Sequence, residues 1–225
     1  GSVNSGSKAL TQNPSMQATR RSAGRTISGI SFDSSAYADP AAVGTIPSVS
    51  YFECALLFVD ISGFTKLSTI LDPESLSKVI NSYFQEICDK VAEFDGDIQK
   101  FAGDALFAAW QPSDNMTLHQ CVEAAAACAT TMVRDCSEFP VMAFGSSVDA
   151  GNEGEQGSMI TTLNIHCGLG VGAMAGIHVG DSTFRREHLF VGDAITQATE
   201  ACDLALLGEV TVSSQFNEEL SGSDA

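Results

Sequence analysis

An uninterrupted apolar run, residues 54–59, constrains the fold of this chain more than any other feature. The run is too short for a typical helix, and it is followed by Asp60 and Gly63, residue types that end strands and form turns. Apolar residues without alternation predict a strand that is buried on both faces, in the middle of a sheet. A polar edge with a functional role is expected directly after this strand.

A long amphipathic helix is predicted next. Asp72, Pro73 and Glu74 form a typical helix start, with a capping side chain, a proline at the first helical position and an acidic first turn. Gly96 is predicted to cap the other end. One apolar stripe at helical spacing would face the core, formed by Leu76, Val79, Ile80, Tyr83, Phe84, Ile87, Val91 and Phe94.

Two short strands, 98–101 and 105–110, are predicted to form a hairpin. Ala102, Gly103 and Asp104 would make its tight turn, where glycine relieves backbone strain.

The second half of the chain continues this alternation of elements. Apolar residues at helical spacing predict a second helix from residues 115–117 to Arg134. The remaining elements are an inserted loop at 145–157, strands at 162–171, 173–179 and 187–191, a polar turn at 180–186, a helix at 194–207 and a last strand at 209–213.

The order strand, helix, strand, strand, helix, strand predicts an α+β fold with a ferredoxin-like βαββαβ core, extended by C-terminal strands and a helix. In this core the first and third strands lie side by side in opposite directions. Asp60 ends the first strand and Asp104 begins the third. We therefore expect both residues at the same edge of the sheet.

Two carboxylates at one sheet edge suit a pair of divalent metal ions that act on a nucleoside triphosphate. Taken singly, Asp60 or Asp104 is more often a turn former. Taken together, at adjoining ends of central strands, they favour a functional site.

Length and composition favour one folded domain. The chain has 225 residues, of which 44% are hydrophobic, enough for one sizeable core. Residues 1–50 are rich in Ser, Thr, Gly and Ala and are predicted to be a disordered tail. The domain is expected at 51–216, followed by a flexible tail at 217–225.

The formal net charge of −17 disfavours nucleic acid and anionic membranes as partners, since both repel an acidic protein. The one basic cluster, Arg20, Arg21 and Arg25, lies in the predicted tail. Because no apolar run could span a bilayer and no signal peptide is recognisable, we expect a soluble cytoplasmic protein without membrane insertion.

Zinc chemistry is not predicted. The seven cysteines are scattered through apolar segments without CxxC spacing, which favours reduced thiols in the core. The four histidines show neither an HExxH motif nor a clustered ligand pattern.

Three segments resemble the catalytic domain of class III nucleotidyl cyclases, and in particular the first catalytic domain of soluble, bicarbonate-responsive adenylyl cyclases. The most specific segments are 58–65 and 96–106, and a weaker one is 189–195. The resemblance extends over about residues 52–214.

This resemblance implies a lyase that converts ATP to cyclic AMP and pyrophosphate at an interface between two domains. Asp60 and Asp104 would bind two Mg²⁺ or Mn²⁺ ions, and the carbonyl group of Ile61 would add a ligand. ATP phosphates would be bound by Gly103 and by the backbone amides of a loop formed by Ile61, Ser62, Gly63, Phe64 and Thr65. The alternative for this loop is an ordinary strand-to-helix turn.

Lys100 shares strand parity with Ile98, so its charged side chain is expected where an apolar one would stand. The resemblance implies that Lys100 and Phe190 belong to a pocket for the adenine base, or to a second pocket that takes bicarbonate. A surface lysine is the alternative.

His166 stands where similar soluble cyclases place a lysine that contacts the triphosphate. Arg185 or Arg186 stands near the place of a phosphate-binding arginine. The alternatives are a core or interface histidine and a solvated turn.

The chain also departs from the family pattern. A complete site needs an adenine-selecting Asp or Thr, an Asn, and an Arg that stabilises transition-state charge, but these positions hold Leu189, Thr196 and Glu200. The domain is therefore expected to need a second cyclase catalytic domain, from the same longer chain or another subunit. Thr199 replaces an arginine of the bicarbonate pocket, which leaves bicarbonate only as a candidate activator.

Two alternatives remain open. The chain could be an inactive pseudo-cyclase module for nucleotide binding or dimerisation, although a scaffold has no use for two carboxylates that repel each other. If this domain recognises the base, Lys100 disfavours GTP as the substrate. If the partner domain recognises the base, the choice between ATP and GTP stays open.

Overall fold

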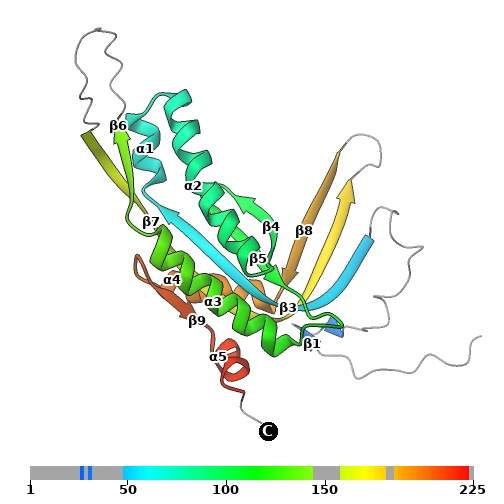
Figure 1. Ribbon diagram of the computed structural model, residues 1–225. Coiled ribbons are helices and arrows are strands. Elements are labelled where there is room, and N and C mark those ends of the chain that lie inside the picture. Colours follow the sequence, from blue (N-terminus) through cyan, green and yellow to red (C-terminus); the bar gives the residue numbers. More distant parts are fainter. Residues whose placement is uncertain (1–25, 28–29, 32–47, 144–157, 181–184, 223–225) are drawn as a thin grey trace, which may run out of the picture.

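The computed structural model describes residues 26–27, 30–31, 48–143, 158–180 and 185–222 (Figure 1). The loop predicted at 145–157, the cluster of Arg20, Arg21 and Arg25, and most of the predicted tail and of the turn at 180–186 lie outside these residues.

A seven-stranded sheet forms the centre of the molecule. Its main path runs in the order β4-β5-β3-β7-β6, and β8 and β9 also pair with β7. The strands are β3 (Ser48–Ser62), β4 (Asp97–Ala102), β5 (Ala105–Trp110), β6 (Phe139–Ala143), β7 (Ser158–Gly180), β8 (Arg186–Gly192) and β9 (Val210–Val212).

Five helices accompany the sheet in the described part of the chain. They are α1 (Phe64–Ile70), α2 (Pro73–Glu93), α3 (Leu118–Cys136), α4 (Asp193–Leu204) and α5 (Ser214–Leu220). The antiparallel order β4-β5-β3-β7, with α2 and α3 as its two helices, is the predicted ferredoxin-like core, so the predicted fold class is confirmed. None of the described helices is long and apolar enough to cross a membrane.

The strand β3 separates two apolar layers, because its successive side chains point to opposite faces of the sheet. Figure 1 shows α2 and α3 side by side across one face. Toward these helices β3 directs Ala55, Leu57, Val59 and Ile61, in the main core. Toward the other face it directs Cys54, Leu56 and Phe58, in a smaller cluster with Ala194 and Ala198 of α4.

The helix α4 packs very closely on β7, because glycines line the contact. A Cβ atom on Gly168 would clash with the carbonyl oxygen of Ala198, and one on Gly170 with the carbonyl oxygen of Ala194. This close contact fixes α4 against one face of the sheet. The side chain of Asp60 points to the same face, because it lies two residues after Phe58 in β3.

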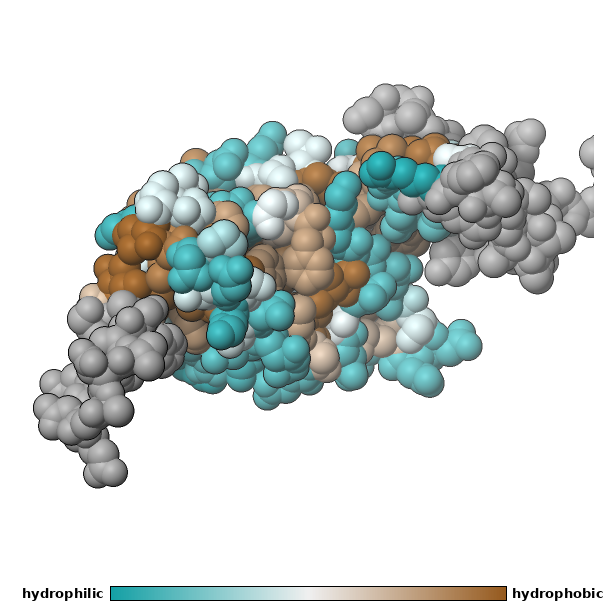
Figure 2. Space-filling model, turned by 90° about the horizontal axis from the view of Figure 1, so that it is seen from above, coloured by the Kyte–Doolittle hydropathy of each residue, from teal (hydrophilic) through white to brown (hydrophobic). Residues whose placement is uncertain are grey.

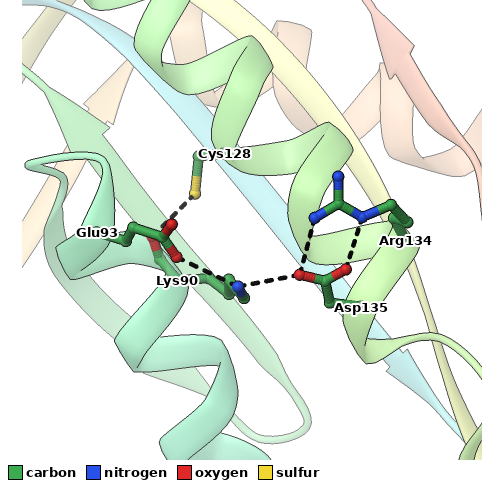
Figure 3. A network of polar contacts seen from close by, with 5 residues as sticks. All are labelled: Lys90, Glu93, Cys128, Arg134 and Asp135. Atoms are coloured by element: carbon green, nitrogen blue, oxygen red, sulfur yellow. Dashed lines mark hydrogen bonds and ion pairs between the residues drawn. The ribbon is translucent and has the colours of Figure 1, made fainter.

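A polar network joins α2 to α3 at the rim of the core (Figure 3). Lys90 Nζ lies 3.2 Å from Glu93 Oε2 and 3.0 Å from Asp135 Oδ2. Asp135 also accepts from Arg134 Nε at 2.7 Å, and these two cations hold the pKa of its carboxyl group well below the usual range. Because the network is partly exposed, we regard it as orienting the helices more than stabilising them.

Both long helices begin where the sequence predicts. Asp72 accepts a hydrogen bond from the backbone of Ser75, and Thr117 caps α3 within a complete capping box. The predicted cap at Gly96 is wrong: α2 ends at Glu93, and Asp95 adopts the left-handed conformation, with φ 57°. Gly96 is needed for space, since a Cβ atom there would lie 2.5 Å from the ring of Trp110.

Several short elements differ from the predictions. The strands expected at 162–171 and 173–179 are one strand, β7, because Gly172 continues the ladder at φ 145°. The helix α1 and the strand β6 were not predicted.

The ends of the domain differ as well. The strand β3 already begins at Ser48, and β1 (Thr26–Ile27) pairs with β2 (Ile30–Ser31) within the predicted tail. Helix α5 occupies the beginning of the tail expected at 217–225, and the side chain of Phe216 anchors it in the main core.

Candidate active site

Asp60 lies near the end of β3, with Ala105 of β5 and His166 of β7 as its direct neighbours across the sheet. Asp104 lies in the turn before Ala105. The backbone N–H of Ile61 donates to the carbonyl oxygen of Asp104 at 3.2 Å. The antiparallel pairing therefore brings Asp60 and Asp104 to the same sheet edge, as predicted.

The surroundings of Asp60 make its negative charge costly. Burial raises the pKa of its carboxyl group, and the charges of Asp104 and Asp203 raise it further, while His166 and the N–H of Ile61 act in the opposite direction. A cation at this edge would relieve the repulsion between the carboxylates.

The donor set suits a hard divalent ion that also binds a substrate. In the described part of the chain, no three His, Cys, Asp or Glu side chains gather closely enough to hold a metal by themselves. Mg²⁺ is typically held by one or two carboxylates together with water and substrate phosphates. Asp60 and Asp104 meet that requirement, and the carbonyl group of Ile61 lies on the same side of β3 as its N–H, toward Asp104.

The loop that follows Asp60 turns sharply into α1. Gly63 adopts φ 102°, and a Cβ atom there would approach the carbonyl oxygen of Thr162 to 3.0 Å. Its own carbonyl oxygen accepts from Leu67, which starts the helix at Phe64. The N–H of Ile61 is already bonded to Asp104 and Ser62 still pairs with Asn164 of β7, so of the predicted phosphate cradle only the amides from Gly63 onward lie outside the strand ladders.

The turn between β4 and β5 is open. Gly103 is exposed, adopts φ 70°, and has no atom within 4 Å of the position that a Cβ would occupy. A ligand could therefore approach the backbone beside Asp104 without displacing protein atoms.

His166 is close to Asp60 itself. Its Nε2 lies 3.5 Å from Asp60 Oδ2, and its side chain is 16% exposed, against 38% for that of Asp60. The other ring nitrogen, Nδ1, is buried without a hydrogen-bond partner among the described residues.

Lys100 does not share the face of Ile98, and this prediction is wrong. The strand β4 has a bulge between them: Ile98 pairs with Ala108, but Lys100 pairs with Phe107. The extra residue reverses the alternation. Ile98 thus faces the main core, whereas the exposed Lys100 lies on the face of Phe107.

Phe190 belongs to an aromatic group on this second face. Its ring meets Phe107 edge-on at 5.7 Å, and Phe107 stacks on Phe58 at 4.5 Å. His188 lies 5.9 Å from Phe190, and its pKa is lowered by burial, by His178 and by the positive charge of Lys100. Lys100 and Phe190 are therefore on one face, as the pocket prediction requires.

Arg185 is not brought to the aspartates. It pairs with Glu187 through Nε at 2.7 Å and is exposed. The neighbouring Arg186 pairs with Gly180, up to roughly 45 Å of extended strand beyond His166. Within one chain Arg186 lies beside the C-terminal end of β7, whereas Asp60 lies beside the middle of that strand.

The residues that depart from the family pattern lie on β8 and α4. Leu189, Thr196 and Glu200 are exposed, and the Thr199 hydroxyl group donates to the carbonyl oxygen of Ile195 at 2.9 Å. Helix α4 carries no Lys or Arg. It therefore offers no cation to a phosphate.

His166 was a candidate site residue from the sequence, but its contact with Asp60 was not predicted, and Asp203 was not found. The contact of His166 with Asp60 depends on the register of β3 against β7, and Asp203 acts from the end of α4. The one available signal was the polar His166 within an otherwise apolar strand pattern.

A ferredoxin-like sheet with paired aspartates at adjoining strand ends defines a class III nucleotidyl cyclase catalytic domain. The chain belongs to this family: residues 46–224 match the adenylate and guanylate cyclase catalytic domain.

Similar proteins include adenylate cyclase type 10 of Oryctolagus cuniculus, 35% identical over 175 residues, which cover 74% of this chain and 10% of that protein. Adenylate cyclase 1 of Rhizobium meliloti is 30% identical over 147 residues, 65% of this chain and 20% of that protein. The chain thus spans about a tenth of the length of the type 10 enzyme.

Solved structures show the same fold. The adenylyl cyclase CyaB from P. aeruginosa superimposes with a TM-score of 0.58 at 19% identity, covering 78% of this chain and 84% of that one. The guanylate cyclase domain of RhGC from Catenaria anguillulae, in complex with GTP, gives 0.58 at 17% identity, covering 78% and 86%.

Proposed function

We propose that this chain is the metal-binding half of an adenylyl cyclase, which converts ATP to cyclic AMP and pyrophosphate together with a second catalytic domain. The observation that carries the proposal is the placement of Asp60 and Asp104 on adjoining strand ends. Relatives at 30–35% identity are named adenylate cyclases, which favours ATP as substrate.

In this proposal Asp60 and Asp104 hold two Mg²⁺ or Mn²⁺ ions. Such ions lower the pKa of the ribose 3′-hydroxyl group and neutralise the triphosphate. Asp60 and Asp104 fix the position of the cations, the carbonyl group of Ile61 adds an oxygen, and the amides after Ser62 orient phosphate oxygens. The open turn at Gly103 admits the nucleotide.

A partner is required because helix α4, where the family places its charge-stabilising arginine, carries no cation in this chain. Lys78 and Lys90 lie on α2 and Arg134 on α3, across the sheet from the side chain of Asp60. Glu200 would repel phosphate. The partner would therefore supply the charge-stabilising arginine and the residues that read the base.

The sheet face that carries the aromatic group of Phe58, Phe107 and Phe190 is the expected contact surface for this partner. Phe58, Phe107 and Phe190 are only partly buried, and apolar residues reach the surface in several places between hydrophilic ones (Figure 2). Lys100 borders this face, so a pocket for adenine or for bicarbonate would form there between the two domains. We propose a cytoplasmic location for the assembly.

The test is cyclic nucleotide production from ATP and, separately, GTP, with Mg²⁺ or Mn²⁺, by this chain alone and mixed with a second cyclase catalytic domain that carries the arginine. Cyclic AMP formed only in the mixture and lost in Asp104→Asn is the expected result. The matched control is Asp114→Asn, a substitution in an exposed turn that should leave the rate unchanged.

A second function, a pseudo-cyclase module, is favoured by Glu200 and by the absence of basic residues from α4. Metal-dependent nucleotide binding without turnover in any mixture would support it. Turnover by this chain alone would instead show that the charge-stabilising group lies within the chain.

A further inference from the structure

His166 and Asp60 face each other across the β3–β7 pair, on the sheet face that carries α4. The distance of 3.5 Å from Nε2 to Oδ2 is at the outer limit of a hydrogen bond. Hydrogen bonds in catalytic sites are often long before the substrate binds, and shorten when the complex forms. The backbone of His166 is held in place by the ladder with β3 and by the thiol of Cys202, which donates to its carbonyl oxygen at 3.6 Å.

The other side of the imidazole ring determines where its proton resides. Nδ1 is buried and has no hydrogen-bond partner in the described part of the chain. A proton on Nδ1 would be a buried donor without an acceptor among the described residues. A bare Nε2 would place its lone pair against the Asp60 carboxylate, 3.5 Å away, with no proton between them. The geometry therefore places a ring proton on Nε2, toward Asp60.

A ring proton on Nε2 disfavours two other roles for His166. Metal coordination through Nε2 would move the proton to Nδ1, and histidines that bind metals typically donate that second N–H to a neighbouring acceptor. No carboxylate or carbonyl group among the described residues accepts from Nδ1. The contact with a triphosphate that resemblance implies for this position would also compete with Asp60 for the one N–H.

We infer that His166 is a positioning residue for Asp60. Its ring donates from Nε2 to Oδ2, which fixes the rotation of the carboxylate group and leaves Oδ1 free for a cation. This role rests on the proposed function, in which Asp60 binds metal. It deepens that function by assigning different tasks to the two oxygens of one carboxylate.

The first test needs neither metal nor nucleotide. Long-range ¹H–¹⁵N NMR correlations of the metal-free chain should show a proton on Nε2 of His166. An Nε2 without a proton would overturn the inference. Because wild-type protein is used, this result does not depend on whether a variant folds.

The second test measures Mn²⁺ affinity by counting free ions with EPR. His166→Leu should weaken binding about 10- to 100-fold, the usual effect of losing a partner of a metal ligand. His166→Gln, whose amide can still donate to Asp60, should stay close to wild type, and His178→Gln serves as a histidine control distant from Asp60.

Unchanged Mn²⁺ affinity in His166→Leu, or a nitrogen ligand from His166 detected on the bound ion by pulsed EPR, would contradict the positioning role. Failure of the wild-type chain to bind Mn²⁺, with the Nε2 proton present, would instead count against the proposed metal site. The two failures are therefore distinguishable.

Discussion

The backbone N–H of Ile61 and the carbonyl oxygen of Asp104, 3.2 Å apart, join the two segments that carry the aspartates. This bond extends the β3–β5 ladder beyond Asp60 and Ala105. The turn that carries Asp104 is therefore tied directly to the strand that carries Asp60. A site that must hold charged groups in fixed positions gains from such support.

Asp60→Asn is expected to raise the thermal unfolding temperature of the metal-free chain at pH 7. Burial and Asp104 raise the pKa of Asp60 above its value in the unfolded chain, so the ionised group destabilises the folded state at neutral pH. The gain should disappear as the pH falls below the unfolded value of 3.8, where both states are protonated. Differential scanning calorimetry, with Asp114→Asn as control, would measure this gain; a lower unfolding temperature would mean that ionised Asp60 stabilises the folded state.

His188 should make the folded state less stable in weak acid. Burial, His178 and Lys100 lower its pKa below the usual value of 6.5, so its stabilising contribution is present above pH 6.5 and is lost as the pH falls through the pKa of the folded state. Urea unfolding at pH 7.5 and 5.5 should show a smaller decrease for His188→Gln than for wild type. Lys100→Gln should raise the NMR titration midpoint of His188, and an unchanged midpoint would place Lys100 elsewhere.

Alanine at Gly63 should cost more stability than alanine at Gly103. Both residues have positive φ, but a Cβ at Gly63 would also press on the carbonyl oxygen of Thr162, whereas the space at Gly103 is open. We expect losses of about 1–2 kcal/mol at Gly103 and about 1 kcal/mol more at Gly63. Chemical denaturation would test this order, and equal losses would mean that the Gly63 loop can move away from Thr162.

Gly168→Ala should displace α4 from the sheet. The added methyl group would meet the carbonyl oxygen of Ala198, a backbone atom that cannot rotate away. Overpacking of this kind costs about 3 kcal/mol or more when backbone must shift. A decrease in the denaturation midpoint and faster amide exchange along α4 are expected, while Gly208→Ala, where φ is 78° but the nearest atom is 3.9 Å away, should lower the midpoint less.

Much of the fold could be predicted from the sequence because local and long-range signals agree. The apolar run before Asp60, the cap at Asp72 and the apolar stripe of α2 each predict an element that the structure contains. The continuity of β7 through Gly172 could not be predicted, since glycine in a strand pattern equally suggests a break. The short helices α1 and α5 each have one buried side chain, Leu67 and Phe216. Their sequences therefore lack the apolar periodicity from which a helix is predicted.

The candidate site was predictable only where it depends on strand ends. Asp60 and Asp104 were placed correctly because antiparallel neighbours must meet there. The prediction of the face on which Lys100 lies was wrong, because it assumed strict alternation of side chains along the strand. The bulge between Ile98 and Lys100 interrupts this alternation, and the sequence carries no signal of it. The pairing of His166 with Asp60 depends on a register between strands about 100 residues apart, which no local pattern encodes.

The chain contains one tryptophan, and its position makes it an optical reporter of the core. The indole ring of Trp110 is 1% exposed, donates from Nε1 to the carbonyl oxygen of Phe94 at 2.7 Å, and fills the space left by Gly96. It stands at the end of β5 opposite to Ala105 and the aspartates. Its fluorescence spectrum should therefore stay unchanged while ions are titrated into the site. The emission should shift to the red only when the helices α2 and α3 separate from the sheet.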